Sequence, residues 1–307
     1  MRIFVTGATG FVGSAIVPEL IGAGHQVLGL ARSDTAALSL TAAGAGVQRG
    51  SLEDLESLQK GAYAADAVIH AGFIHDFANY ATAAETDRRA IETMGTVLAG
   101  SERPFIITSG TALTAPGRVA TEADMANANL PRKSEEAAAS AAASGARVSV
   151  LRLPPSVHGV RDHGFVPLLI RIAREKGVSA YVGEGRNRWP AVHRLDAAHL
   201  YRLVIEKRPV APRFHAVADA GVAFREIAEV IGRRLNVPVV SKSPEEAADH
   251  FGWFAHFVGL DCPASSAQTQ EQLGWRPTQA SLIPDIDQPS YFETKQKTFD
   301  QMAGATR

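Results

Sequence analysis

The stretch that decides the fold is TGATGFVG, residues 6–13, which directly follows the apolar run RIFV at residues 2–5. The run predicts a buried strand, and the apolar positions 12, 16, 17, 20 and 21 fit one face of a helix. Glycines at such a junction permit a tight turn, let the backbone approach a ligand, and pack the helix against the strand. The free N–H groups at the helix start then face an anion. The stretch therefore predicts a dinucleotide pyrophosphate site.

Strand-like apolar runs recur along the first half of the chain, with helical stretches between them. They lie at residues 2–6, 26–31, 67–71, 105–109 and 148–153. An alanine-rich helix at residues 135–144 precedes the last of them. Strands that alternate with helices favour right-handed crossovers and a parallel sheet covered on both faces. We therefore predict an α/β protein with a doubly wound parallel sheet, that is, a Rossmann fold.

The carboxy-terminal part is predicted to form a smaller, mixed substrate region. After Pro154 and Pro155 the alternation fades, and aromatic residues gather at positions 251–257. A helix at residues 196–205 and a strand at residues 214–218 are expected to belong to the main sheet. The predicted dinucleotide-binding domain is residues 1–155, with 191–218 returning to it, and the predicted substrate region is residues 156–190 and 219–307.

Composition narrows the class of protein. The chain has 307 residues, of which 46% are hydrophobic and 21% charged, and its net charge is -1; this is typical of a globular protein with no nucleic-acid partner. The lone Cys262 excludes an intrachain disulfide framework and a cysteine metal cluster, so we expect no metal. No apolar run approaches a membrane span, and no export signal is seen at the amino terminus. We expect a cytoplasmic protein with a small-molecule substrate and no membrane contact.

Five segments resemble the extended short-chain dehydrogenases/reductases, the group that contains NAD-dependent epimerases and dehydratases. They occur in the family's order over nearly the whole chain: TGATGFVG (6–13), AVIHAG (67–72), FIITSGTA (105–112), LRLPPSVHG (151–159) and RWPAVHRLDAAHL (188–200). The resemblance implies NAD or NADP at the carboxyl ends of the strands and a substrate beneath the carboxy-terminal region. A homodimer is a further expectation, by analogy with the fold alone.

The resemblance also implies which residues bind the cofactor. The pyrophosphate is expected at the glycine turn, the nicotinamide ribose beside residues 71–72, and the adenine beside residues 51–52. The implied set is Gly7, Thr9, Gly10, Phe11, Val12, Gly13, Ser51, Leu52, Ala71, Gly72, Thr108, Pro154 and Pro155. Ser51 departs from the family, which usually has an aspartate at this position.

The end of the second predicted strand indicates which dinucleotide binds. A carboxylate there would accept hydrogen bonds from the adenine ribose and repel a 2′-phosphate. This chain has Arg32 and Ser33 instead, and a guanidinium with a hydroxyl suits a phosphate. Asp34 follows too late to be the ribose acceptor, unless a looser turn brings it back. We therefore predict NADP, with NAD as the less favoured alternative.

The family's catalytic Tyr-x-x-x-Lys pair is missing from its usual helix. Spacing of four residues would place both side chains on one helix face. If Ser134 and Glu135 occupy the family's Ser-Lys position, the tyrosine has become Pro131 and the lysine has become Glu135. A second register gives Asn129 with Lys133, again without a tyrosine. The string Tyr291 to Lys295 lies far past the sixth strand, and we reject it as the catalytic pair.

Other residues must then handle the substrate oxygen and its proton. Thr111 or Ser109, after the fifth strand, is predicted to donate a hydrogen bond to that oxygen, although such hydroxyls often only cap backbone groups. His75, beside Asp76, and His158 are the predicted proton donors, since histidine titrates near neutral pH. Each has the alternative of a purely structural histidine, which is the role expected of His193.

Three functions remain open on the sequence. The favoured one is an NADP-dependent oxidoreductase that moves a hydride to or from a small carbonyl or hydroxyl compound. The absence of the Tyr/Lys pair supports a second, a dinucleotide-binding sensor without catalysis. The third is a nucleotide-sugar epimerase or dehydratase, which would also normally need the tyrosine.

Overall fold

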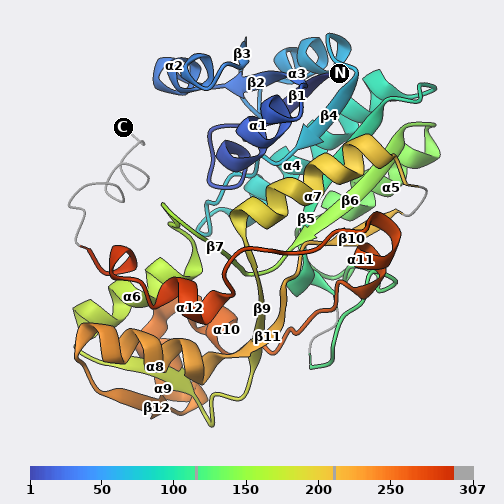
Figure 1. Ribbon diagram of the computed structural model, residues 1–307. Helices are drawn as coiled ribbons and strands as arrows, with labels where there is room; N and C mark the ends of the chain where they lie inside the picture. Colours follow the sequence, from blue (N-terminus) through green and yellow to red (C-terminus); the bar gives the residue numbers. More distant parts are fainter. Residues whose placement is uncertain (115–116, 210–211, 294–307) are drawn as a thin grey trace.

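A seven-stranded parallel sheet forms the larger half of the molecule (Figure 1). The computed structural model describes residues 1–114, 117–209 and 212–293. The strand order is β10-β6-β5-β4-β1-β2-β3, so the direction of winding reverses between β1 and β4. The strands are β1 (Arg2–Thr6), β2 (Gln26–Ala31), β3 (Gly46–Arg49), β4 (Ala67–His70), β5 (Pro104–Gly110), β6 (Arg147–Leu153) and β10 (Arg213–His215). This is the predicted doubly wound α/β fold, and the prediction is confirmed.

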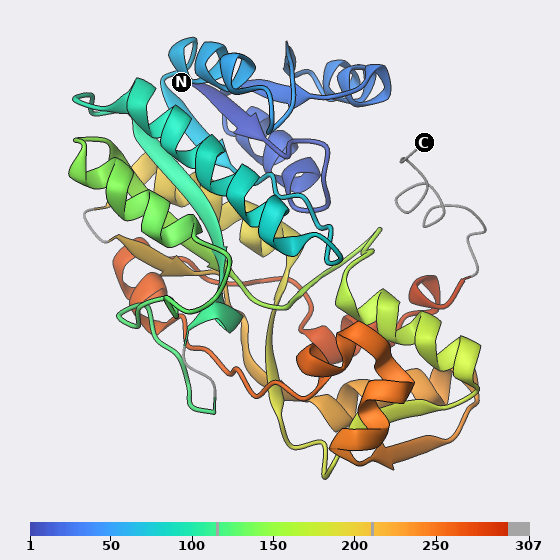
Figure 2. The same cartoon turned by 180° about the vertical axis from the view of Figure 1, so that it is seen from behind.

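Helices cover both faces of the sheet because its strands are apolar on both sides. In β1, Ile3 and Val5 face one layer while Phe4 faces the other, as the period of two requires. Figure 2 shows one face, covered by α3 (Leu55–Tyr63), α4 (Tyr80–Leu98) and α5 (Ser134–Ala143). The opposite face is covered by α1 (Gly13–Gly22) and α7 (Arg194–Lys207), and α2 (Asp34–Ala42) packs beside β3.

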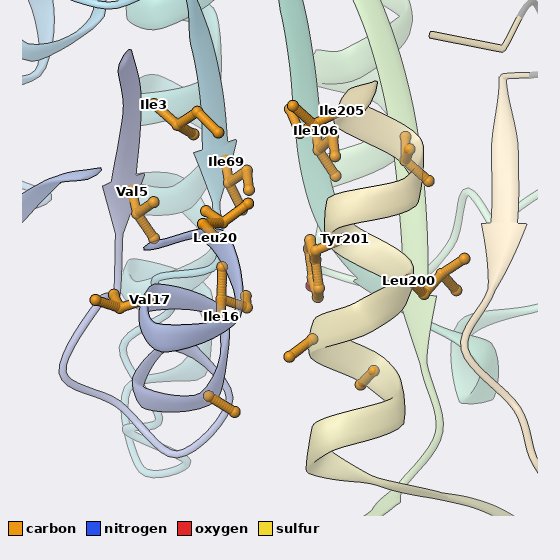
Figure 3. Close-up of a cluster of buried hydrophobic side chains, with 14 of the residues drawn as sticks. Ile3, Val5, Ile16, Val17, Leu20, Ile69, Ile106, Leu200, Tyr201 and Ile205 are labelled. Atoms are coloured by element: carbon orange, nitrogen blue, oxygen red, sulfur yellow. The ribbon is translucent and has the colours of Figure 1, made fainter. Parts of the chain in front are cut away.

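The core beneath α1 and α7 fixes the glycine turn to the sheet. Ile16 and Leu20 of α1 are fully buried against Val5, and Tyr201 of α7 is fully buried beside them (Figure 3). Burying side chains of this size stabilises the fold by about 1.5–3 kcal/mol each. The start of α1 therefore cannot move far from the end of β1.

The smaller half is built on a three-stranded sheet in the order β11-β9-β7. Its strands are β7 (Ser156–His158), β9 (Arg188–His193) and β11 (Asp219–Ala223); β7 is parallel to β9 and β11 is antiparallel to it. A parallel pair, β8 (Ser179–Val182) and β12 (Val239–Lys242), lies apart from it. The helices of this half are α6 (Phe165–Lys176), α8 (Phe224–Leu235), α9 (Pro244–Phe251), α10 (Ala255–Val258) and α12 (Leu282–Ile286), and α11 (Ala267–Leu273) lies beside α7 and β10.

Three short 3-10 helices complete the described elements: η1 (Thr111–Leu113), η2 (Gly252–Phe254) and η3 (Pro289–Tyr291). The smaller half has its own core, centred on Trp189, Phe224 and Phe254, all of which are at most 1% exposed. It therefore forms a separate packing unit next to the carboxyl ends of the main strands.

Candidate functional site

The glycine turn after β1 packs backbone to backbone against the segment after β4. Gly7 has a φ of +66°, and a Cβ there would lie 2.6 Å from the Gly72 nitrogen. A Cβ at Gly13 would lie 2.0 Å from the Gly7 carbonyl oxygen. Neither position can accept a side chain without movement of the backbone. The turn therefore lies at the point where the winding reverses, which is where open α/β sheets bind their ligands.

A buried chain of hydrogen bonds links this turn to α4. The Gly72 N–H donates to Thr6 Oγ1 over 3.2 Å, and Thr6 Oγ1 lies 2.8 Å from His70 Nδ1. His70 Nε2 lies 3.1 Å from Asp87 Oδ1, and both side chains are 1% exposed. Burial alone would raise the pKa of Asp87, but the hydrogen bond and charge of His70, with Arg132 and Ser134, lower it. Asp87 is therefore an ionised acceptor inside the protein.

A second chain reaches Asp87 from the other side. Ser134 Oγ donates to Asp87 Oδ2 over 2.5 Å, and Arg132 Nε donates to Ser134 Oγ over 2.8 Å. Arg132 Nη2 donates to the Thr108 carbonyl oxygen over 2.9 Å, and its guanidinium lies 4.2 Å from the centre of the Phe73 ring. The positive charge of Arg132 is thus held at the carboxyl ends of β4 and β5.

At the end of β2, Arg32 and Ser33 are exposed. Ser33 caps α2, because its Oγ accepts the Ala36 N–H over 3.2 Å. Asp34 is the first residue of α2 and forms an ion pair with Arg49 at the end of β3. Two guanidinium groups therefore lie at this edge of the sheet, and the neighbouring carboxylate is paired with one of them.

The remaining implied cofactor residues lie at the carboxyl ends of the strands or in the loops that follow them. Leu52 is near Gly72, since a Cβ on Gly72 would lie 3.3 Å from the Leu52 side chain. Ser51 Oγ accepts the N–H groups of Glu53 and Asp54, so its hydroxyl shapes its own loop. The others lie in the turn after β1, directly after β4, within β5 and directly after β6: Thr9, Gly10, Phe11 and Val12; Ala71; Thr108; and Pro154 and Pro155.

In one of the two predicted registers, Pro131 and Glu135 stand at the positions of the family's Tyr/Lys pair. Glu135 binds Arg152 of β6 through two hydrogen bonds, from Nε over 2.8 Å and from Nη2 over 2.7 Å. Arg152 is fully buried, and its Nη1 also contacts His215. Pro131 is exposed. Glu135 is therefore part of a structural ion pair, and neither position offers a proton donor.

Two hydroxyls at the end of β5 are buried without a hydrogen-bond partner. Ser109 Oγ and Thr111 Oγ1 have none among the described residues, although the two residues are only 2% and 1% exposed. Buried polar atoms are nearly always paired, and an unpaired one points to a ligand or a water. By contrast, Thr108 Oγ1 lies 2.6 Å from the Tyr201 hydroxyl. Ser109 and Thr111 can therefore hold a substrate oxygen.

His75 lies in the loop between β4 and α4 and is exposed. Its ring contacts Phe73, 5.3 Å away between centres. Desolvation lowers the pKa of His75, and the positive charges of Arg132 and His163 lower it further. In the same loop, Phe77 stacks on Trp253 with 4.5 Å between ring centres. The structure thus brings His75 close to Arg132, and the loop contacts the smaller half.

His158 is fully buried in β7, away from this loop. Its Nδ1 lies 2.8 Å from Asp285 Oδ2, and Tyr291 donates to the same oxygen over 2.9 Å. The Tyr291 hydroxyl also accepts the Gly159 N–H over 2.8 Å. His158 Nε2 is buried with no partner in the described part of the chain. These contacts connect β7 to the α12–η3 segment. Tyr291 of the rejected Tyr-x-x-x-Lys string belongs to this cluster, and Lys295 lies outside the described residues.

Sequence reasoning assigned no role to Asp87, Arg132 or Arg49, and no shifted pKa to Asp162. Burial raises the pKa of Asp162 to about 7, and its Oδ1 accepts the Gly164 N–H over 2.7 Å. A signal for Asp87 was present, since it falls on the apolar stripe of α4 formed by Ala83, Ala84, Ala90, Ile91 and Met94. Arg132 has no comparable local signal, because its partners come from β5, the loop after β4, and α4.

Two further classes of site were sought in residues 1–114, 117–209 and 212–293. No group of three or more His, Cys, Asp or Glu side chains there is placed to bind a metal ion. No helix in these ranges has both the length and the apolar character needed to cross a membrane.

Comparisons with known proteins agree with this geometry. The model of the NAD dependent epimerase/dehydratase family matches residues 3–126. The chain is 50% identical to the uncharacterized protein C2A9.02 of Schizosaccharomyces pombe, over 95% of this chain and 100% of that protein. It is 28% identical to the 4-hydroxy-2-methyl-3-oxo-4-farnesyl-3,4-dihydroquinoline-1-oxide ketoreductase of Stigmatella aurantiaca, over 82% of this chain and 80% of that protein.

A solved structure shares the fold over almost its whole length. The UDP-glucose 4-epimerase of Thermotoga maritima superimposes with a TM-score of 0.73 at 19% identity, covering 95% of this chain and 98% of that one. The turn, the reversal of winding and the matched sequence agree, and residues 3–126 are similar to the NAD dependent epimerase/dehydratase family.

Proposed function

We propose that the chain is an NADP-dependent oxidoreductase that acts on a small carbonyl or hydroxyl compound. The observation that carries the proposal is the pair of buried, unpaired hydroxyls of Ser109 and Thr111 at the sheet edge that bears the glycine turn. Each such hydroxyl can donate one hydrogen bond to a ligand oxygen. The similarity to a ketoreductase supports the same reaction class.

The glycine turn fits a dinucleotide, because Gly7 and Gly13 let it pack closely on the segment after β4 and on itself, while Thr9 and Gly10 are exposed at its tip. Gly7, Gly10 and Val12 would line the pyrophosphate. Bound NADPH would supply the hydride, so the protein has to bind, orient and exchange one proton. These tasks fall to the side chains around the end of β5.

The 2′-phosphate of NADP would lie beside Arg32 and Ser33. Arg49 adds a second positive charge at this edge and pairs with Asp34, the carboxylate that could otherwise favour NAD. Guanidinium groups bind phosphate more strongly than neutral donors do. This arrangement supports NADP over NAD.

In the proposed reaction, Ser109 or Thr111 would donate a hydrogen bond to the substrate oxygen. His75 would exchange a proton with that substrate oxygen. Since the pKa of His75 is lowered, its imidazole is neutral near pH 7 and accepts a proton from an alcohol more readily than it donates one. His158 is the alternative proton donor, although its burial against Asp285 gives it less access.

A second function has a specific observation in its favour. In the register that aligns Glu135 with the family's catalytic lysine, that residue is held in an ion pair with Arg152, as expected of a protein that binds the dinucleotide without turning it over. Such a sensor would bind NADPH tightly and leave it unchanged.

The test measures binding first and turnover second, on the full chain. We expect NADPH to bind more tightly than NADH, and Arg32→Gln to raise the Kd for NADPH about tenfold or more while leaving that for NADH unchanged. Arg225→Gln, at an exposed arginine on α8, is the matched control. A preference for NADH, unaffected by Arg32→Gln, would contradict the assignment of NADP.

Turnover is followed as loss of reduced nicotinamide with aldehydes and ketones such as 4-nitrobenzaldehyde and ethyl acetoacetate. Consumption of NADPH, lost in Ser109→Ala or Thr111→Val, is the expected result. Tight binding without consumption would favour the sensor. Conversion of a nucleotide sugar with no net consumption would favour an epimerase.

A further inference from the structure

Arg132 lies beside the reacting end of the proposed site, although no sequence motif marks it. It precedes α5 by two residues, and its Nη2 donates to the carbonyl oxygen of Thr108 in β5. Its guanidinium covers the ring of Phe73, the residue that follows Gly72. The charge is therefore placed between the end of β5 and the segment that packs on the glycine turn.

The guanidinium is fixed in orientation and has a free edge. Nε donates to Ser134 Oγ, and Asp87 Oδ2 lies 4.0 Å from Nε. The side chain is only 14% exposed. Nη1 has no hydrogen-bond partner among residues 1–114, 117–209 and 212–293. A held guanidinium with one open nitrogen can bind an oxygen without rearranging.

Other unpaired donors share the end of β5. The buried hydroxyls of Ser109 and Thr111 follow Thr108 within three residues. His75 is close enough for the charge of Arg132 to lower its pKa. Glu135, the helix residue in the lysine position, is bound to Arg152 and adds no positive charge here. Arg132 is therefore a cation held at the end of β5, beside these donors.

We propose that Arg132 replaces the missing Tyr/Lys pair as the positive group that binds the substrate's carbonyl oxygen. The inference rests on the proposed oxidoreductase function and specifies its substrate as a compound that reacts at an accessible C=O. When the carbonyl carbon gains a hydride, the π electrons of the C=O bond move to the oxygen, and the alkoxide lies against Arg132. The oxygen then takes one proton from water, directly or relayed through the neutral imidazole of His75.

Arg132 acts by charge alone, since an arginine side chain does not release its proton in a protein. Donors preorganised toward a developing oxyanion contribute about 100-fold or more to the rate. The Asp87 carboxylate stabilises the guanidinium through Ser134. The guanidinium is therefore already in place and does not have to move when the substrate oxygen becomes negative. Burial between Phe73 and β5 strengthens the interaction relative to bulk water.

The test compares Arg132→Ala and Arg132→Lys with Arg89→Ala, a control at an exposed arginine on α4. For reduction of 4-nitrobenzaldehyde we expect Arg132→Ala to lower kcat/KM about 100-fold, with an unchanged Kd for NADPH. Added guanidinium at low concentration should restore part of the rate in Arg132→Ala and none in the control. A kcat/KM within about threefold of the native value, in a variant that unfolds at the native temperature, would overturn the inference.

A binding measurement separates this inference from the proposed function. 4-Nitrobenzoate has the shape of the aldehyde and presents a negative oxygen, so we expect it to quench protein fluorescence with NADP bound. Its Kd should rise about tenfold or more in Arg132→Ala and stay unchanged in Arg89→Ala. Arg132-dependent binding without turnover would refute the oxidoreductase and keep the oxyanion site. Turnover that does not depend on Arg132 would support the oxidoreductase and refute the role of Arg132. If the chain shows neither 4-nitrobenzoate binding nor turnover, both proposals are overturned.

Discussion

Glu135 of α5 binds both Nε and Nη2 of Arg152, an arginine that is fully buried in β6. The pair ties the helix to the sheet. Arg152 Nη2 also donates to the Asp124 carbonyl oxygen over 2.7 Å. The ion pair is therefore the centre of a buried polar cluster.

Replacing Glu135 with Gln should destabilise the protein strongly. It would leave the Arg152 charge buried without a counter-ion, which typically costs about 3–5 kcal/mol. Urea unfolding checks the loss. The double variant Glu135→Leu/Arg152→Met removes both charges and should cost less than the sum of the single changes. A Gln variant as stable as the native chain would show that the pair contributes little.

Stability should fall in mild acid because of His215. Its Nδ1 donates to the Ser265 carbonyl oxygen over 2.7 Å, and its Nε2 faces the Arg152 guanidinium 3.1 Å away, so the ring is held neutral. Desolvation lowers the pKa of His215 below 6.5. The unfolded chain then binds a proton first as the pH falls, and the free energy of unfolding decreases from pH 6.5 downward.

The control for this effect is His256, a histidine on the short helix α10. His215→Gln should flatten the dependence of unfolding free energy on pH below 6.5, while His256→Gln should leave its shape unchanged. An equally steep acid loss in His215→Gln would assign the effect to other groups, such as His193, whose pKa burial also lowers.

Gly13→Ala should damage both stability and dinucleotide binding. The new Cβ would lie 2.0 Å from the Gly7 carbonyl oxygen, so the turn must move. We expect a loss of about 3 kcal/mol and a weaker NADPH complex. Gly22→Ala, at the other end of the same helix with nothing within 4 Å, should be neutral or slightly stabilising. Native NADPH affinity in Gly13→Ala would show that the turn does not contact the cofactor.

Asp162→Asn should stabilise the protein at alkaline pH and not in acid. Burial raises the pKa of Asp162 from 3.8 to about 7, so the folded state prefers the neutral form. The native chain loses stability as the pH rises from 3.8 through about 7, and Asn avoids this loss while keeping an oxygen for the Gly164 N–H. Thermal unfolding at several pH values checks it, and a gain of the same size at every pH would contradict the titration.

Much of the fold could be predicted because its signals are local. The predicted strands match β1 and β2 at both ends and β4, β5 and β6 to within one residue. The edge strand β3 was missed, since GVQR is short, polar and at most half-buried and so lacks the apolar run of a central strand. The predicted strand at residues 214–218 begins one residue earlier and ends at His215, because Phe214 and His215 pair with β6 while the next residues leave the sheet.

The candidate site was only partly predictable. The glycine turn could be recognised because a steric requirement leaves glycine at fixed spacing in the sequence. The placement of Arg132 could not, because it depends on contacts with Thr108 and Phe73 that only the folded chain creates. Likewise, the pairing of Glu135 with Arg152 joins residues of two elements, and no local pattern indicates it. The roles of His75, His158, Ser109 and Thr111 stay predictions.

The two hydrogen-bond chains that meet at Asp87 have a direction. An ionised carboxylate only accepts, so His70 must carry a proton on Nε2 and Ser134 must point its proton at Asp87. When the His70 ring is neutral, its Nδ1 is an acceptor and Thr6 must point its proton at His70. The charge of Asp87 therefore orients the protons of His70 Nε2 and Ser134 Oγ toward it. An asparagine amide offers one acceptor and one donor group, so an Asp87→Asn variant would have to reverse one of the two chains. Asp87 therefore controls the donor and acceptor direction of hydrogen bonds on both sides of the candidate site.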